Sequence, residues 1–266
     1  MTYESIRYEV VADHVAKLTL DRPHRKNAYD VRLAQECVDA IGRYAADDDL
    51  RVLIVTGAED AFCSGGDIRS DADEHIAATR TLSHATVMRE GFHALATALH
   101  ALEKPTIAMV NGPAVAGGLT LALLCDLRIA SDRARLGDTS GTAGLLPDEG
   151  GAWLFPRFLG LEQALRMTYF GEVYSAQEAL RLGLVGEVVP HDRLEQETLQ
   201  RAQALARRAP LAIRMAKKMM IRGLTNSFPE SLGDAQMAVM IVNDSQDVAE
   251  GVKAFLDKRP PEFVGR

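Results

Sequence analysis

Near its start the chain alternates apolar and polar residues with the period of two that is typical of β-strands. The alternation runs over Ile6 to Val11 and again over Val15 to Leu20, across the short stretch Ala12-Asp13-His14. Two such runs joined by a tight polar turn predict a β-hairpin, which ends at Pro23 because proline cannot donate to the ladder. From Asp30 to Tyr44 apolar residues recur at helical spacing, which predicts a helix capped by Asp30.

Farther along, short continuous apolar runs alternate with helical patterns. The apolar runs cover Val52 to Thr56, Thr106 to Val110 and Leu127 to Ala130. Helical patterns lie within His75 to Leu102 and over Gly118 to Cys125. Buried strands that alternate with helices favour an α/β architecture with parallel strand pairing.

Beyond Pro190 the pattern is helical throughout. The helix-forming stretches are Leu194 to Arg207, Leu211 to Arg222 and Asp234 to Leu256. We therefore expect an α/β core over residues 1–200 and a helical region over residues 201–266. No low-complexity linker separates them, so the helical region is expected to pack on the core or on a neighbouring subunit.

Composition and charge narrow the class of protein. The 266 residues carry a formal net charge of -7, which argues against nucleic acid or an anionic membrane as partner, because both need a clustered positive surface. The three cysteines, Cys37, Cys63 and Cys125, are too far apart for a metal-ligand cluster, so no metal site is expected. The sequence has no signal core and no apolar stretch of membrane length. We expect a cytoplasmic protein with reduced thiols.

Two glycine-rich segments give the first indication of chemistry. The first segment is Ala61 to Ile68, directly after one apolar run, and the second segment is Asn111 to Leu119, directly after the next. Small residues leave backbone N–H groups accessible, and a helix start adds its dipole. Alone, the first segment fits an ordinary tight turn, and the second fits a close helix–strand contact that needs glycine for packing. Two of them at the ends of successive strands can aim N–H groups at one oxygen, as in an oxyanion hole, where one donor is worth about 3 kcal/mol.

With these segments and three further motifs, the chain resembles the enoyl-CoA hydratase/isomerase (crotonase) superfamily over essentially its whole length. In chain order the motifs are Asp21-Arg22-Pro23 with Asn27-Ala28, the first segment, the second segment continued to Cys125-Asp126, Gly144-Leu145-Leu146-Pro147 with Gly150-Gly151 and Pro156-Arg157, and Lys258 to Phe263. The resemblance implies a spiral of β-β-α turns with a helical C-terminal region. It implies an acyl-coenzyme A thioester as substrate, no separate cofactor, and a homotrimer or a dimer of trimers.

The resemblance also assigns the site by position. The backbone N–H groups of Ser64 and Gly117 would hold the thioester oxygen, which carries the charge of an enolate. The substrate would lie along Arg25, Ala28, Ser64, Gly65, Gly66, Asp67, Ile68, Gly117, Gly118, Thr120 and Ser140.

At two positions the chain departs from the hydratase pattern of the family. A family hydratase uses two glutamates to hold and activate one water, whereas Thr120 and Ser140 stand at those positions here. Neither hydroxyl is a general base without a partner. A hydratase mechanism copied from the family is therefore not expected.

A different acidic pair, Asp148-Glu149, directly precedes Gly150-Gly151. Adjacent acids are common in exposed loops, but the apolar neighbours on both sides favour a pocket, where a carboxylate has a raised pKa and transfers protons well. Some Δ3,Δ2-enoyl-CoA isomerases of the superfamily have a catalytic glutamate at the place of Glu149, and related ones an aspartate at that of Asp148. We therefore expect an enoyl-CoA isomerase, with Glu149 preferred over Asp148 as the base.

Three alternatives stay open. The first is an acyl-CoA hydrolase or dehalogenase in which Asp148 or Glu149 is nucleophile or base. The second is an enoyl-CoA hydratase with an atypical water site. The third is a non-catalytic CoA-binding scaffold.

Overall fold

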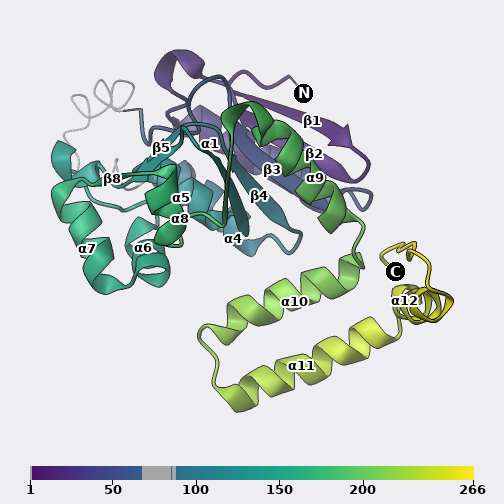
Figure 1. Ribbon diagram of the computed structural model, residues 1–266. Coiled ribbons are helices and arrows are strands. Elements are labelled where there is room, and N and C mark those ends of the chain that lie inside the picture. Colours follow the sequence, from purple (N-terminus) through teal and green to yellow (C-terminus); the bar gives the residue numbers. More distant parts are fainter. Residues whose placement is uncertain (1, 68–84, 86–87) are drawn as a thin grey trace.

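The main sheet has six strands in the order β1-β2-β3-β4-β6-β9 (Figure 1). The structure is a computed structural model that describes residues 2–67, 85 and 88–266. The strands are β1 (Ile6–Ala12), β2 (Val15–Leu20), β3 (Val52–Gly57), β4 (Thr106–Val110), β6 (Leu127–Ser131) and β9 (Glu187–Val189). The predicted hairpin is confirmed, because β1 pairs antiparallel with β2 and Ile6 lies opposite Leu20.

All other pairings in this sheet are parallel, as the alternation of strands and helices predicted. β3 lies between β2 and β4, and β6 lies between β4 and β9. Parallel strands end at the same edge of a sheet. The two glycine-rich segments that follow β3 and β4 therefore leave the sheet next to each other.

A smaller sheet supports the second glycine segment. It contains β5 (Pro113–Val115), β7 (Arg135–Gly137) and β8 (Val173–Ser175), in that order. Helix α5 (Gly117–Leu124) follows β5 after a single residue, and its first seven residues are buried. Three further helices lie around this region, namely α6 (Gly151–Leu159), α7 (Leu161–Phe170) and α8 (Ala176–Arg181).

Helices cover both faces of the main sheet, each over its own apolar core. On one face α1 (Val31–Ala46) packs against α4 (Phe92–Ala101), and on the other α9 (Leu194–Ala206) packs on β3 and β4. The Asp30 side chain caps α1, as predicted, by accepting a 2.8 Å hydrogen bond from the Leu33 N–H. Part of the helix expected within residues 75–102 lies outside the described residues, and α4 is its described part.

The C-terminal helices lie apart from the sheet (Figure 1). They are α10 (Pro210–Gly223), α11 (Phe228–Asn243) and α12 (Gln246–Asp257), and α10 packs alongside α11. The single helix expected over residues 234–256 is wrong. The chain ends α11 and starts α12 at Ser245, whose hydroxyl accepts from the Val248 N–H at 3.4 Å. Residue 200, where the helical region was expected to begin, lies inside α9.

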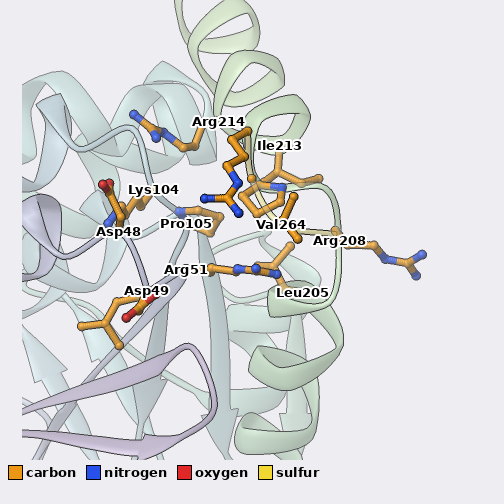
Figure 2. A pocket seen from close by; sticks show the side chains of 14 residues that line it. Asp48, Asp49, Arg51, Lys104, Pro105, Leu205, Arg208, Ile213, Arg214 and Val264 are labelled. Carbon is orange, nitrogen blue, oxygen red and sulfur yellow. The ribbon is translucent and has the colours of Figure 1, made fainter. Parts of the chain in front are cut away.

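Two cations, Arg51 and Lys104, lie at the amino ends of β3 and β4, and Arg51 fastens the C-terminal region to the sheet. They line a cavity of about 280 Å³ (Figure 2). The Arg51 guanidinium donates to the carbonyl oxygens of Ala206 and Phe263 at 3.0 and 2.9 Å. The Lys104 ammonium donates to carbonyl oxygens at the end of α1. The carbonyl ends of α9 and α1, where the helix dipole is negative, therefore compensate these charges. We assign Arg51 and Lys104 a structural role at this cavity. No described helix is both long and apolar enough to span a bilayer.

Candidate active site

The two glycine segments meet, as their places in the sequence predicted. An isolated parallel bridge joins Cys63 to Ala114, and the Val115 N–H donates to the Cys63 carbonyl oxygen at 3.1 Å. A Cβ atom on Gly65 would lie 3.5 Å from the Gly117 nitrogen, and one on Gly118 only 2.0 Å from the Cys63 carbonyl oxygen. Glycine at position 118 is what lets α5 approach the first segment this closely.

The Ser64 N–H is not a free donor, which corrects the expected oxyanion hole. It donates to the Lys26 carbonyl oxygen at 3.1 Å. Two residues later, Gly66 pairs with Tyr29, whose N–H donates to Gly65 and whose carbonyl oxygen accepts from Asp67. In a parallel pairing the bonds of one residue bracket its partner, so the Gly66 N–H points away from Tyr29's backbone.

Gly66 and Gly117 instead have N–H groups without an acceptor in the described part of the chain. Gly117 is the first residue of α5, where no carbonyl of the same helix can accept its N–H. Both glycines border one point, the Tyr29 hydroxyl. A Cβ on Gly66 would lie 3.4 Å from that oxygen, and a Cβ on Gly117 would lie 2.8 Å from it. Two glycines with unused N–H groups therefore border the same small region.

Glu149 brings a carboxylate to this region. Its Oε1 accepts a hydrogen bond from the Tyr29 hydroxyl at 2.7 Å and lies 2.7 Å from the place of a Cβ on Gly117. Gly150, with φ at 110°, turns the chain into α6 directly after it. The residue is 8% exposed, and burial raises the pKa of Glu149, while the Tyr29 hydrogen bond partly opposes the rise. Its Oε2 is buried and has no partner among the described residues.

Asp148 is placed differently. Its side chain is exposed, and its carbonyl oxygen lies 2.9 Å from Nε2 of His93 in α4. Of the two acids singled out in the sequence, the structure therefore brings Glu149 to the glycine segments and leaves Asp148 at the surface.

The two hydroxyls at the hydratase positions have separate environments. Thr120, in α5, is fully buried and its Oγ1 has no partner in the described part of the chain. Ser140 donates through Oγ to Asp138 Oδ1 at 2.7 Å, and Thr168 donates to the other oxygen of Asp138, also at 2.7 Å. Thr120 Oγ1 thus has no hydrogen-bond partner among the described residues, whereas the Ser140 hydroxyl donates to Asp138.

The remaining predicted binding residues surround the first segment. Asp67 is buried and forms an ion pair with Arg22 at 2.9 Å, and the half-buried Arg25 lies 3.8 Å from the same carboxylate. The buried Ala28 accepts from Arg22 through its carbonyl oxygen. Ile68 lies outside the described residues. The Asp67 carboxylate is therefore already paired with Arg22, whereas the half-buried Arg25 keeps part of its side chain exposed beside the first segment.

Sequence reasoning missed Tyr29 and Asp138. Both touch the site through side-chain atoms, yet neither stands in a motif that draws attention to its chemistry. The one signal for Tyr29 was its place directly after Asn27-Ala28, which end a motif of the expected family. No group of three potential metal-ligating side chains occurs among the described residues.

Comparison with known proteins finds relatives over the whole chain. The family model described as enoyl-CoA hydratase/isomerase matches residues 11–266. A probable enoyl-CoA hydratase of Rhodobacter capsulatus is 38% identical over 266 residues, covering both chains fully. The 2,3-dehydroadipyl-CoA hydratase of Escherichia coli K12 is 34% identical over 252 residues, which are 95% of this chain and 96% of that protein.

A solved structure shows the same fold. The crystal structure of an enoyl-CoA hydratase from Bacillus anthracis matches with a TM-score of 0.93 at 32% identity, covering 99% of this chain and 100% of that one. The predicted α/β fold of the crotonase type is therefore confirmed, and the isomerase preference finds no support in these names. The chain belongs to the enoyl-CoA hydratase/isomerase family, the crotonase superfamily of acyl-CoA enzymes.

Proposed function

We propose that Glu149 moves a proton at the carbon next to the thioester carbonyl, while the Gly66 and Gly117 N–H groups stabilise the enolate oxygen. The observation that carries the proposal is the buried carboxylate beside the α-carbon of Gly117. In a thioester the acidic carbon is one bond from the carbonyl carbon. A base next to an oxyanion donor therefore faces the proton whose removal that donor assists.

A shift of the double bond from Δ3 to Δ2 is the reaction that needs only this carboxylate. Glu149 takes a proton from C2 of a 3-enoyl-CoA, and the electrons spread through the dienolate onto the thioester oxygen. The same carboxyl group then returns the proton to C4, and the new double bond forms between C2 and C3. Burial favours this exchange, because a carboxylate with a raised pKa is a stronger base once ionised.

Hydration of a 2-enoyl-CoA is the second candidate. The hydratase names of the relatives favour it, and so do two buried oxygens without partners, Glu149 Oε2 and Thr120 Oγ1. A water bound to either oxygen would satisfy it. Glu149 would take its proton as the water adds to C3, and the enolate would receive that proton at C2.

The remainder of the substrate would occupy the first segment. We place the coenzyme A part of the acyl-CoA along Ser64, Gly65 and Gly66, with Arg25 as the cation available to a phosphate. Coenzyme A would enter as part of the substrate, with no separate cofactor.

A side-by-side assay of the wild-type protein tests the reaction class. The conjugated thioester absorbs in the ultraviolet, so 3-hexenoyl-CoA gains absorbance on isomerisation and crotonyl-CoA loses it on hydration. We expect faster turnover of 3-hexenoyl-CoA. Faster loss of crotonyl-CoA would replace isomerisation by the second candidate, and release of free thiol from either substrate would indicate a hydrolase.

A further inference from the structure

We infer that Tyr29 is a positioning residue, whose hydroxyl holds one oxygen of the Glu149 carboxylate and leaves the other oxygen to exchange the proton with substrate. This inference rests on the proposed role of Glu149 as the base. It goes beyond the proposed function, because it makes the orientation of the Glu149 carboxylate depend on a second side chain.

The backbone of Tyr29 is fixed to the first glycine segment. Its N–H donates to the Gly65 carbonyl oxygen at 2.9 Å, and its own carbonyl oxygen accepts from the Asp67 N–H at 2.9 Å. Asn27, which is fully buried, holds the approach to Tyr29 by donating to the Ala58 and Ala61 carbonyl oxygens. The residue therefore moves with the segment that carries the Gly66 donor.

The ring of Tyr29 is fixed against the second segment. It packs on Phe92 of α4 with a centroid separation of 4.4 Å, and its Cε1 lies 2.6 Å from the place of a Cβ on Gly117. A side chain larger than hydrogen at position 117 would occupy this space. Tyr29 thus contacts both proposed donors and the base at once.

The hydroxyl can only act as a donor to Glu149. Burial and the neighbouring carboxylate raise the pKa of Tyr29 above its usual range, so the phenol keeps its proton. Tyr29 is the one side chain in the described part of the protein that donates to Glu149. The hydrogen bond holds Oε1, and Oε2 is left without a protein partner. A carboxylate fixed at one oxygen has a fixed direction at the other.

The Tyr29→Phe variant tests this role, because it removes the hydroxyl and keeps the ring. A matched control is Tyr44→Phe, since Tyr44 in α1 is also buried. Its hydroxyl donates to the Pro105 carbonyl oxygen at 3.1 Å and not to Glu149. Both variants are assayed across pH with whichever of 3-hexenoyl-CoA and crotonyl-CoA the wild type converts faster, and their melting temperatures are compared.

We expect Tyr29→Phe to lower kcat by roughly 10-fold to 100-fold, the worth of one hydrogen bond to a charged group, with KM changed less than about 2-fold. The Tyr29 hydrogen bond lowers the pKa of Glu149, so its loss should also move the acid limb of the pH–rate profile to higher pH. Tyr44→Phe should lower the melting temperature and leave kcat and the acid limb unchanged.

Two further results separate the inference from the proposed function. If Glu149→Gln is inactive while Tyr29→Phe keeps the wild-type kcat and acid limb, the inference is wrong and the role of Glu149 stands. If Glu149→Gln keeps wild-type turnover, or the wild type converts neither substrate, the proposed function fails and the inference with it. Adding Tyr29→Phe to Glu149→Gln should cause no further loss, because the hydroxyl then has no base to position.

Discussion

At the scale of single residues, the site is defined by which polar groups are already bonded and which are not. The Ser64 N–H, the Asp67 carboxylate and the Ser140 hydroxyl all have protein partners. Gly66 N–H, Gly117 N–H and Glu149 Oε2 have none among the described residues. A buried polar group without a partner is costly unless a ligand satisfies it. The unpaired set therefore supports the proposed place of the thioester more sharply than the glycine motifs do.

Burial of Glu149 gives a pH dependence of stability that can be measured without substrate. Its pKa is raised in the folded protein, so between the ordinary carboxyl value and the raised value the folded protein holds a proton that the unfolded chain has lost. The free energy of unfolding should therefore fall as pH rises through this window. Glu149→Gln should remove that part of the fall and be the more stable protein at neutral pH.

Urea unfolding at weakly acidic and at neutral pH measures this effect. Asp148→Asn is the control, because the exposed Asp148 gives no such gain. A Glu149→Gln protein that is no more stable than wild type at neutral pH would mean that the carboxylate is not held in an apolar setting.

The difference between Ser64 and Gly66 shows what sequence alone could not decide at this scale. Sequence predicted that the first segment donates an N–H group and that Glu149 or Asp148 supplies the acid. Which N–H is free depends on the pairing of Gly66 with Tyr29, a contact between segments 37 positions apart in the sequence. Ser64 and Gly66 are two residues apart in an extended segment, so their N–H groups point to the same side of the strand but meet different partners. No local sequence pattern distinguishes the two.

At the scale of elements, the site depends on how closely α5 approaches the first glycine segment. Gly118 sets that distance, because a Cβ there would lie 2.0 Å from the Cys63 carbonyl oxygen, a backbone atom that cannot rotate away. The parallel order of β3 and β4 brings the two segments together, and glycine lets them touch.

Gly118→Ala should therefore separate the segments and destabilise the fold by about 1–3 kcal/mol, the usual cost of overpacking. Gly233→Ala is the matched control, since Gly233 lies inside α11 with nothing within 4 Å of its Cβ position. This control should gain up to about 1 kcal/mol from helix propensity. Denaturant unfolding measures both, and a Gly118→Ala protein as stable as wild type would contradict this close contact.

Elements with strong local signals were predicted from the sequence, and those without them were not. The strand Thr106–Val110 was located to the residue from its apolar run and flanking Pro105 and Asn111-Gly112. The three-residue strands of the small sheet are too short to show a period. The break between α11 and α12 has no proline or glycine, and only the Ser245 cap marks it.

At the scale of the whole molecule, the helices α10 to α12 carry much of the exposed apolar surface. Met220, Phe228, Met240 and Phe255 are all more than 65% exposed, and an apolar hollow of about 270 Å³ lies between α10 and α11. Contiguous apolar surface of this kind is typical of protein–protein contacts. In the homotrimer or dimer of trimers expected from the sequence, which stays a prediction, these helices would pack on neighbouring copies.

Met240→Glu should weaken that assembly, because it places a charge within the apolar surface of α11. Sedimentation velocity should show three or six copies for the wild type and smaller species for the variant. Val10→Glu, an exposed apolar position on β1, should leave the assembly unchanged. A wild-type protein that sediments as a single chain at micromolar concentration would contradict the proposed assembly.

The most direct test of the central claim compares Glu149→Gln with Asp148→Asn in the faster of the two assays. Loss of a general base typically costs about 10²–10⁴-fold in rate. We expect that loss in kcat for Glu149→Gln and near-wild-type turnover for Asp148→Asn, because only Glu149 lies beside Gly117. The reverse pattern, or full activity in both variants, would contradict the assignment of Glu149 as the base.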